Sequence, residues 1–200
     1  MDGRLRQTRA LGSNYMPVSK RVANEPDVKL PDPDRLPFWE VTAACVSLLL
    51  AFVFAARAIA SSLWLDETAT YWVVKDGLRD VLTRCWEWTG ASAPYDLLAW
   101  FSSFLTPVTG IEPALRLPSL VAMAIATVLV YQLGRYIADR RTGLLGAVAF
   151  LCIHPVAFAA IYARPYALGL ALLVASMLYF LKWLDSPRRL YAVIYVIASV

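Results

Sequence analysis

Residues Leu117–Ile137 read LPSLVAMAIATVLVYQLGRYI, and this run decides the class of fold. Its one charged residue, Arg135, lies near its end, and about 20 apolar residues in a helix cross the ~30 Å of hydrocarbon in a bilayer. Three other runs have similar length and composition: Val41–Ala60, Gly143–Ile161 and Pro165–Leu184. The sequence therefore predicts an all-α fold, a polytopic bundle of transmembrane helices.

The composition agrees with this class. Of the 200 residues, 59% are hydrophobic and 17% are charged, whereas soluble domains have about 45–50% apolar and about 25% charged residues. The net charge of +4 is not gathered in a basic patch, and no Gly-rich phosphate loop, dinucleotide fingerprint or Cys/His metal spacing occurs. Three widely spaced cysteines give no disulfide framework. We therefore expect no nucleic-acid partner.

The two ends of the chain differ in character. Residues 1–40 are polar, mixed in charge and rich in proline, which removes backbone donors, so we expect a disordered cytoplasmic tail. This lead is too long for the n-region of a signal peptide, so the first run is read as a span. The last apolar run, from Leu190 to Val200, is too short to cross as a helix. We expect a transmembrane domain over residues 41–200 that is cut off inside a span.

Basic residues predict the topology. The segment Pro94–Thr106 is apolar but too short to cross; if it crossed, the basic loops at residues 135–141 and 182–189 would lie outside. With this segment on the surface, the N-terminus and both basic loops are cytoplasmic. The first outer loop, residues 61–115, then holds three basic and seven acidic residues. This asymmetry favours a cell-membrane protein with its N-terminus inside.

The outer loop contains two stretches with helical spacing of apolar residues, Glu67–Trp88 and Pro94–Thr106. Gly77 is expected to break the first stretch into two pieces, and Trp72 and Trp86 suit the headgroup level. We therefore predict two or three short amphipathic helices that lie flat on the outer leaflet.

An acidic pair follows the first span directly, in the stretch SLWLDETAT at residues 62–70. One interpretation of Asp66 and Glu67 is a helix N-terminus, where unpaired N–H groups favour carboxylates. However, Trp64 and Leu65 place the pair at the hydrocarbon boundary, where an ionised carboxylate is costly without a task or a partner. A carboxylate there can accept a proton from a hydroxyl, or help to hold a metal at a phosphate. The pair is therefore a candidate catalytic site.

A second polar feature lies between the third and fourth long runs, in IYARPYAL at residues 161–168. An arginine at that depth needs an anion, so Arg164 is a candidate for binding a carboxylate or a lipid phosphate. The alternative is an interfacial arginine that snorkels between two tyrosines. Asp96 either faces the same outer cavity or begins a solvated helix, and Arg116 is expected to contact headgroups.

Six short motifs follow one another along the chain. They are Leu65-Asp66-Glu67, Ala93-Pro94-Tyr95-Asp96-Leu97-Leu98, Leu115-Arg116-Leu117-Pro118-Ser119, Gly134-Arg135, Arg141-Thr142-Gly143 and Ala163-Arg164-Pro165-Tyr166. From about Trp39 to its end the chain resembles the GT-C superfamily of membrane glycosyltransferases, in particular the branch with protein O-mannosyltransferases and lipid A aminoarabinose transferases.

The resemblance implies transfer of a sugar from a polyprenyl-phosphate carrier to a glycan, lipid or protein acceptor on the outer face. By this resemblance Asp66 would be the general base or would orient the acceptor, and Glu67 would assist it. Arg164 would bind the donor phosphate, and Asp96 and Tyr166 are candidates for the substrate cavity.

The chain departs from many relatives at two positions. It has Ser92-Ala93-Pro94 where they carry His-Pro-Pro, and Tyr162 where they carry an acidic residue. Those positions have been linked to metal or donor contacts, so no metal site is assigned and a divalent metal stays an open alternative. The other class of function left open is a non-catalytic membrane protein, either an inactive glycosyltransferase remnant or a small transporter.

Overall fold

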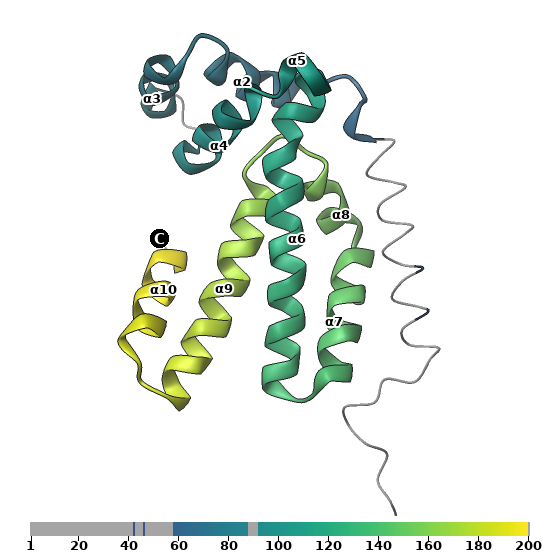
Figure 1. Ribbon diagram of the computed structural model, residues 1–200, viewed down its shortest axis with the longest axis vertical. Helices are drawn as coiled ribbons and strands as arrows, with labels where there is room; N and C mark the ends of the chain where they lie inside the picture. Colours follow the sequence, from purple (N-terminus) through teal and green to yellow (C-terminus); the bar gives the residue numbers. More distant parts are fainter. Residues whose placement is uncertain (1–41, 43–45, 47–57, 88–91, 200) are drawn as a thin grey trace, which may run out of the picture. The chain divides into compact units, whose positions relative to one another are not determined.

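The computed structural model describes residues 42, 46, 58–87 and 92–199. The expected tail and nearly all of the expected first span, Val41–Ala60, lie outside the described residues. Within the described part every regular element is a helix, which confirms the all-α prediction. Four short helices come first: α2 (Leu65–Val74), α3 (Leu78–Glu87), α4 (Ala93–Ser103) and α5 (Thr106–Thr109). Five follow: α6 (Ile111–Ile137), α7 (Arg140–Cys152), α8 (His154–Ala160), α9 (Tyr166–Asp185) and α10 (Arg189–Ser199) (Figure 1).

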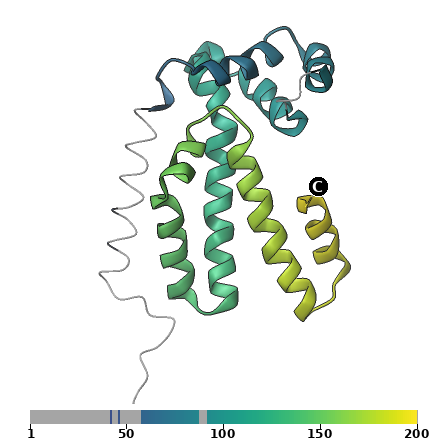
Figure 2. The same cartoon turned by 180° about the vertical axis from the view of Figure 1, so that it is seen from behind.

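Two of the described helices, α6 and α9, are long and apolar enough to cross a membrane. They confirm the runs predicted at Leu117–Ile137 and Pro165–Leu184. Helix α6 begins six residues earlier than the apolar run, and its 27 residues are about 40 Å long at 1.5 Å per residue. It packs against both α7 and α9, so it is the central helix of the described bundle (Figure 2).

The turn between α6 and α7 depends on two glycines. Thr142 N–H donates to the Asp139 carboxylate at 2.7 Å, which caps α7. A Cβ added to Gly143 would lie 2.5 Å from the Tyr131 carbonyl oxygen, and one on Gly134 would lie 2.7 Å from the Gly143 Cα. The two helices therefore approach closely because neither position carries a side chain.

The third expected span, Gly143–Ile161, does not form one helix. Helices α7 and α8 meet at a bend of 77°, with Ile153 in an extended conformation between them. Pro155 lies in the first turn of α8 and has no N–H to continue the hydrogen bonds of α7. The apolar run predicted as a span is therefore a pair of helices with a sharp bend, which together are long and apolar enough to count as one broken span.

Helices α2 to α5 lie around the N-terminal end of α6 (Figure 1). Gly77 separates α2 from α3 with a φ of +124°, as its position in the sequence predicts. Helix α4 has 11 residues and is about 16 Å long, half the thickness of the hydrocarbon. Its buried residues include Tyr95 and Asp96, while large apolar side chains such as Phe101 stay exposed.

Two clusters of buried side chains hold the described part together. One joins α2, α3, α4, the start of α6 and Ala163, with Val73, Val81, Tyr95 and Leu115 among its members. The other joins α6, α8 and α9 and consists mainly of alanines. Small residues let apolar helices approach closely. The short segment between α8 and α9 is thereby held beside α2.

Candidate functional site

The acidic pair lies in the first turn of helix α2, and its two side chains point to different sides of the helix. Glu67 is fully buried, whereas Asp66 is exposed. Successive residues of a helix differ by about 100° around its axis, so one faces the core and its neighbour faces out. A Glu67 carboxylate oxygen also accepts the Trp64 backbone N–H at 2.9 Å, which closes the first turn of the helix.

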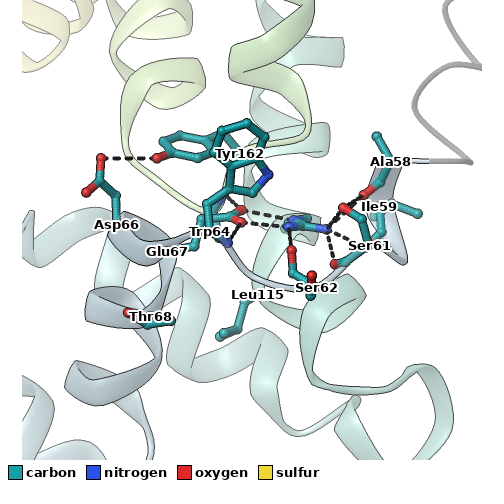
Figure 3. A network of polar contacts seen from close by, with 12 residues as sticks. Ala58, Ile59, Ser61, Ser62, Trp64, Asp66, Glu67, Thr68, Leu115 and Tyr162 are labelled. Atoms are coloured by element: carbon teal, nitrogen blue, oxygen red, sulfur yellow. Dashed lines mark hydrogen bonds and ion pairs between the residues drawn. The ribbon is translucent and has the colours of Figure 1, made fainter.

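Glu67 forms a two-point ion pair with Arg116 of α6. Arg116 Nε lies 2.9 Å from Glu67 Oε1, and Nη2 lies 2.6 Å from Oε2. Arg116 is 1% exposed, and its remaining donors bind the backbone carbonyls of Ala58, Ile59, Ser61 and Ser62 at 2.8–3.2 Å (Figure 3). The expectation that Arg116 contacts headgroups was wrong, because the loop before α2 supplies its partners inside the protein.

The same two helices hold the segment between α8 and α9. Glu67 Oε1 accepts the Ala163 N–H at 2.7 Å, and Thr70 Oγ1 donates to the Ala163 carbonyl at 2.9 Å. Ser119 Oγ lies 2.6 Å from the Tyr162 carbonyl oxygen. We call Glu67, Thr70, Arg116 and Ser119 the clamp. It ties residues 58–62, the start of α2 and residues 162–164 into one unit.

The clamp keeps Glu67 ionised. Burial alone would raise the pKa of Glu67, but hydrogen bonds from Arg116, Ala163 and Trp64 outweigh it and hold the pKa below its usual value. Both oxygens of this carboxylate are occupied by donors from the protein. Glu67 is therefore placed to position its neighbours, and Asp66 is the member of the pair that faces outward.

The exposed carboxylate of Asp66 has one partner from the distant segment. Tyr162 Oη donates to Asp66 Oδ2 at 3.2 Å (Figure 3). Burial, and then the hydrogen bond to Asp66, raise the pKa of the Tyr162 phenol to about 12, so it stays protonated at neutral pH. Tyr162 stacks on Tyr166 with ring centroids 6.0 Å apart and lies 4.8 Å from the ring of Phe158. Asp66 thus sits beside a row of aromatic rings.

The family model for dolichyl-phosphate-mannose-protein mannosyltransferases matches residues 94–200, more than half of the chain. The chain belongs to this mannosyltransferase family. No match is found to a curated protein or to a solved structure. The family and the candidate spans together make the chain a membrane protein of the glycosyltransferase kind.

The part that matches the mannosyltransferase family, residues 94–200, contains Arg116 and Ser119 of the clamp and the whole segment from Tyr162 to Tyr166. Asp66 and Glu67 lie before it. Arg116 and Ser119 were not predicted as partners of the acidic pair. Their spacing of three residues, which places them on one face of α6, is the signal in the sequence that points to a shared contact.

The other predicted site residues of this mannosyltransferase-family chain lie near the same end of α6. Arg164 is half-buried, and its backbone N–H donates to the Tyr162 carbonyl at 2.7 Å. Tyr166 is exposed at the start of α9. Asp96 is only 3% exposed and accepts the Ser92 N–H at 2.9 Å, so it holds the start of α4. Burial raises the pKa of Asp96, and the Arg164 charge is among the effects that oppose the rise.

Two apolar cavities flank α9 below this region. One of about 610 Å³ lies between α8 and α9, with Tyr166 and Phe158 in its lining. The other, of about 540 Å³, lies between α4, α6 and α9. Within the described residues, no group of three His, Cys, Asp or Glu side chains is arranged to hold a metal ion.

Proposed function

We propose that this protein transfers a sugar from a polyprenyl-phosphate carrier to an acceptor on the outer face of the cell membrane. The observation that carries the proposal is the exposed Asp66 carboxylate, which accepts a hydrogen bond from Tyr162 two residues before Arg164. A carboxylate and a guanidinium at one end of the candidate spans suit a donor whose phosphate sits at the membrane surface. Membership of the mannosyltransferase family supports the same class of reaction.

In the proposed reaction Asp66 accepts the proton of the acceptor hydroxyl. The acceptor oxygen forms a bond to the anomeric carbon of the sugar, the bond from that carbon to the phosphate oxygen breaks, and polyprenyl phosphate leaves. The negative charge that develops on the leaving phosphate needs a cation. We propose Arg164 for this role, and a positioning role for Glu67 because its oxygens already have partners.

The proposal is tested with membranes that contain the protein and a set of polyprenyl-phosphate sugars labelled in the sugar. Label should pass to an acceptor from at least one of these donors, and not from the corresponding nucleotide sugars. Membranes without the protein provide the control. Absence of transfer from every lipid-linked donor would favour the alternative of a non-catalytic membrane protein.

Arg164→Lys should lower transfer at limiting donor about tenfold, and Arg164→Ala should lower it further. A guanidinium presents a planar pair of donors to phosphate oxygens, which an ammonium does not reproduce although it keeps the charge. Losing one hydrogen bond to a charged group corresponds to a factor of about ten or more. The measurement is the rate of transfer as a function of donor concentration.

Arg79→Lys is the matched control, because Arg79 is an exposed arginine of α3. It should transfer sugar at the parent rate. A lysine snorkels as well as an arginine, so full activity of Arg164→Lys would show that Arg164 is only an interfacial anchor.

We also propose that the end of α6 near α2 faces outward and that the turn between α6 and α7 is cytoplasmic. Single cysteines at Thr109 and Arg140, in a protein without its native cysteines, test this orientation. Both positions are exposed and lie at opposite ends of α6. An impermeant thiol reagent applied to intact cells should label Thr109→Cys and not Arg140→Cys. The reverse pattern would contradict the orientation.

A further inference from the structure

We infer that Tyr162 is a positioning residue of the proposed transferase, one that fixes the Asp66 carboxylate through a hydrogen bond from its phenol and leaves the second carboxylate oxygen for the acceptor. The inference rests on the proposed function, because it assigns Tyr162 a role toward the group proposed as the base. Tyr162 directly follows the third apolar run, whereas the proposed base, Asp66, follows the first.

The first support is the rigidity of the Tyr162 backbone. Its carbonyl oxygen accepts a hydrogen bond from Ser119 Oγ at 2.6 Å and the Arg164 N–H at 2.7 Å. The backbone N–H of the next residue, Ala163, donates to Glu67, and the Ala163 carbonyl oxygen accepts a hydrogen bond from Thr70. Four hydrogen bonds to two consecutive residues leave the Cα of Tyr162 little freedom to move.

The second support is the fixed direction of the ring. Tyr162 is 7% exposed, and its ring centroid lies 4.8 Å from that of Phe158 and 6.0 Å from that of Tyr166. The Tyr162 and Tyr166 rings are within 9° of parallel. A buried ring that packs against two aromatic neighbours and is attached to a clamped backbone has few orientations open to it, and in this one its hydroxyl lies 3.2 Å from Asp66 Oδ2.

The third support is the contrast between the two partners. Asp66 is exposed and lies in the first turn of α2, where a short side chain has several rotamers in reach. The Tyr162 hydroxyl is the partner that restrains it, and this phenol remains a donor at neutral pH. Holding a reacting group in one geometry lowers the barrier of the chemical step and leaves the affinity for substrate largely unchanged.

Tyr162→Phe tests the inference, because phenylalanine keeps the ring stack and removes only the hydroxyl. The expected result is a kcat about tenfold lower, the factor for losing a modest hydrogen bond to a charged group. The KM values for donor and acceptor should stay within about twofold of the parent, since the buried hydroxyl acts through Asp66. Tyr71→Phe, the same change at an exposed tyrosine of α2, should leave both constants unaltered.

A second substitution keeps the test decisive. Incorporation of 4-aminophenylalanine at position 162 restores a donor at the end of the ring, and it should recover most of the lost kcat. Tyr162→Phe with the parent kcat, or with a raised KM and unchanged kcat, would overturn the inference. A loss in Tyr162→Phe that the amino ring does not recover would overturn it too. Parent activity in Asp66→Asn would instead refute the proposed base, and this outcome is read from that single variant.

Discussion

Asp66→Asn should lower the rate of sugar transfer about 10²- to 10⁴-fold, the usual cost of losing a general base. Asparagine keeps the shape of the side chain and can still accept the Tyr162 hydrogen bond, but it does not take a proton from the acceptor. Because Asp66 is exposed and lies outside the clamp, the substitution should leave folding intact. The measurement is transfer of labelled sugar by parent and variant at equal protein abundance.

A carboxylate on another helix supplies the control for this prediction. Glu112→Gln removes another carboxylate, from the first turn of α6, and should transfer sugar at the parent rate. If Asp66→Asn turns over as the parent does, Asp66 is not the base.

Glu67→Gln should destabilise the protein by about 3–5 kcal/mol, because it leaves the Arg116 charge buried without its counter-ion. Arg116 is 1% exposed, so solvent would screen its unpaired charge only weakly. The amide also accepts fewer hydrogen bonds than the four that Glu67 receives from Arg116, Ala163 and Trp64. The free energy of unfolding in detergent measures the effect.

Asp66→Asn is the matched control here, since it makes the same kind of change one residue away at an exposed position. A Glu67→Gln protein as stable as Asp66→Asn would show that the ion pair contributes nothing net. Any loss of transfer in Glu67→Gln should accompany this loss of stability, as expected for a residue that positions others.

The stabilisation from Glu67 should depend on pH in a defined direction. The pKa of Glu67 in the folded protein lies below its ordinary value of 4.5. Its contribution is therefore complete above that value and is lost as the pH falls through the lowered folded-state pKa. As the pH falls below about 4.5, the stability of the parent should therefore decrease more steeply than that of Glu67→Gln.

Much of the fold could be predicted from local pattern. The apolar runs at Leu117–Ile137 and Pro165–Leu184 gave the two candidate spans, and Gly77 marked the break between α2 and α3. Length and periodicity act within one segment, so they can be read from that segment alone. Pro155 indicates the break at Ile153, but the residues on both sides are apolar, so the two helices together look like one span in the sequence.

The site was harder to predict because its contacts join distant parts of the chain. Arg116 binds a residue 49 positions away, and Tyr162 reaches Asp66 across 96 positions. Nothing in the local sequence distinguishes the buried Glu67 from the exposed Asp66 until the helix and its packing are known. The same holds for Asp96, whose carboxylate turns inward to the start of its own helix.

The most direct test of the account is the fate of a donor labelled twice, with one isotope in the sugar and another in the phosphate. Incubated with the protein in membranes, this donor should yield one molecule of free polyprenyl phosphate for each sugar that appears on the acceptor. Asp66→Asn should lower the rates at which both products form by the same factor. Release of lipid phosphate without sugar on an acceptor, or no release at all, would contradict the proposed transfer.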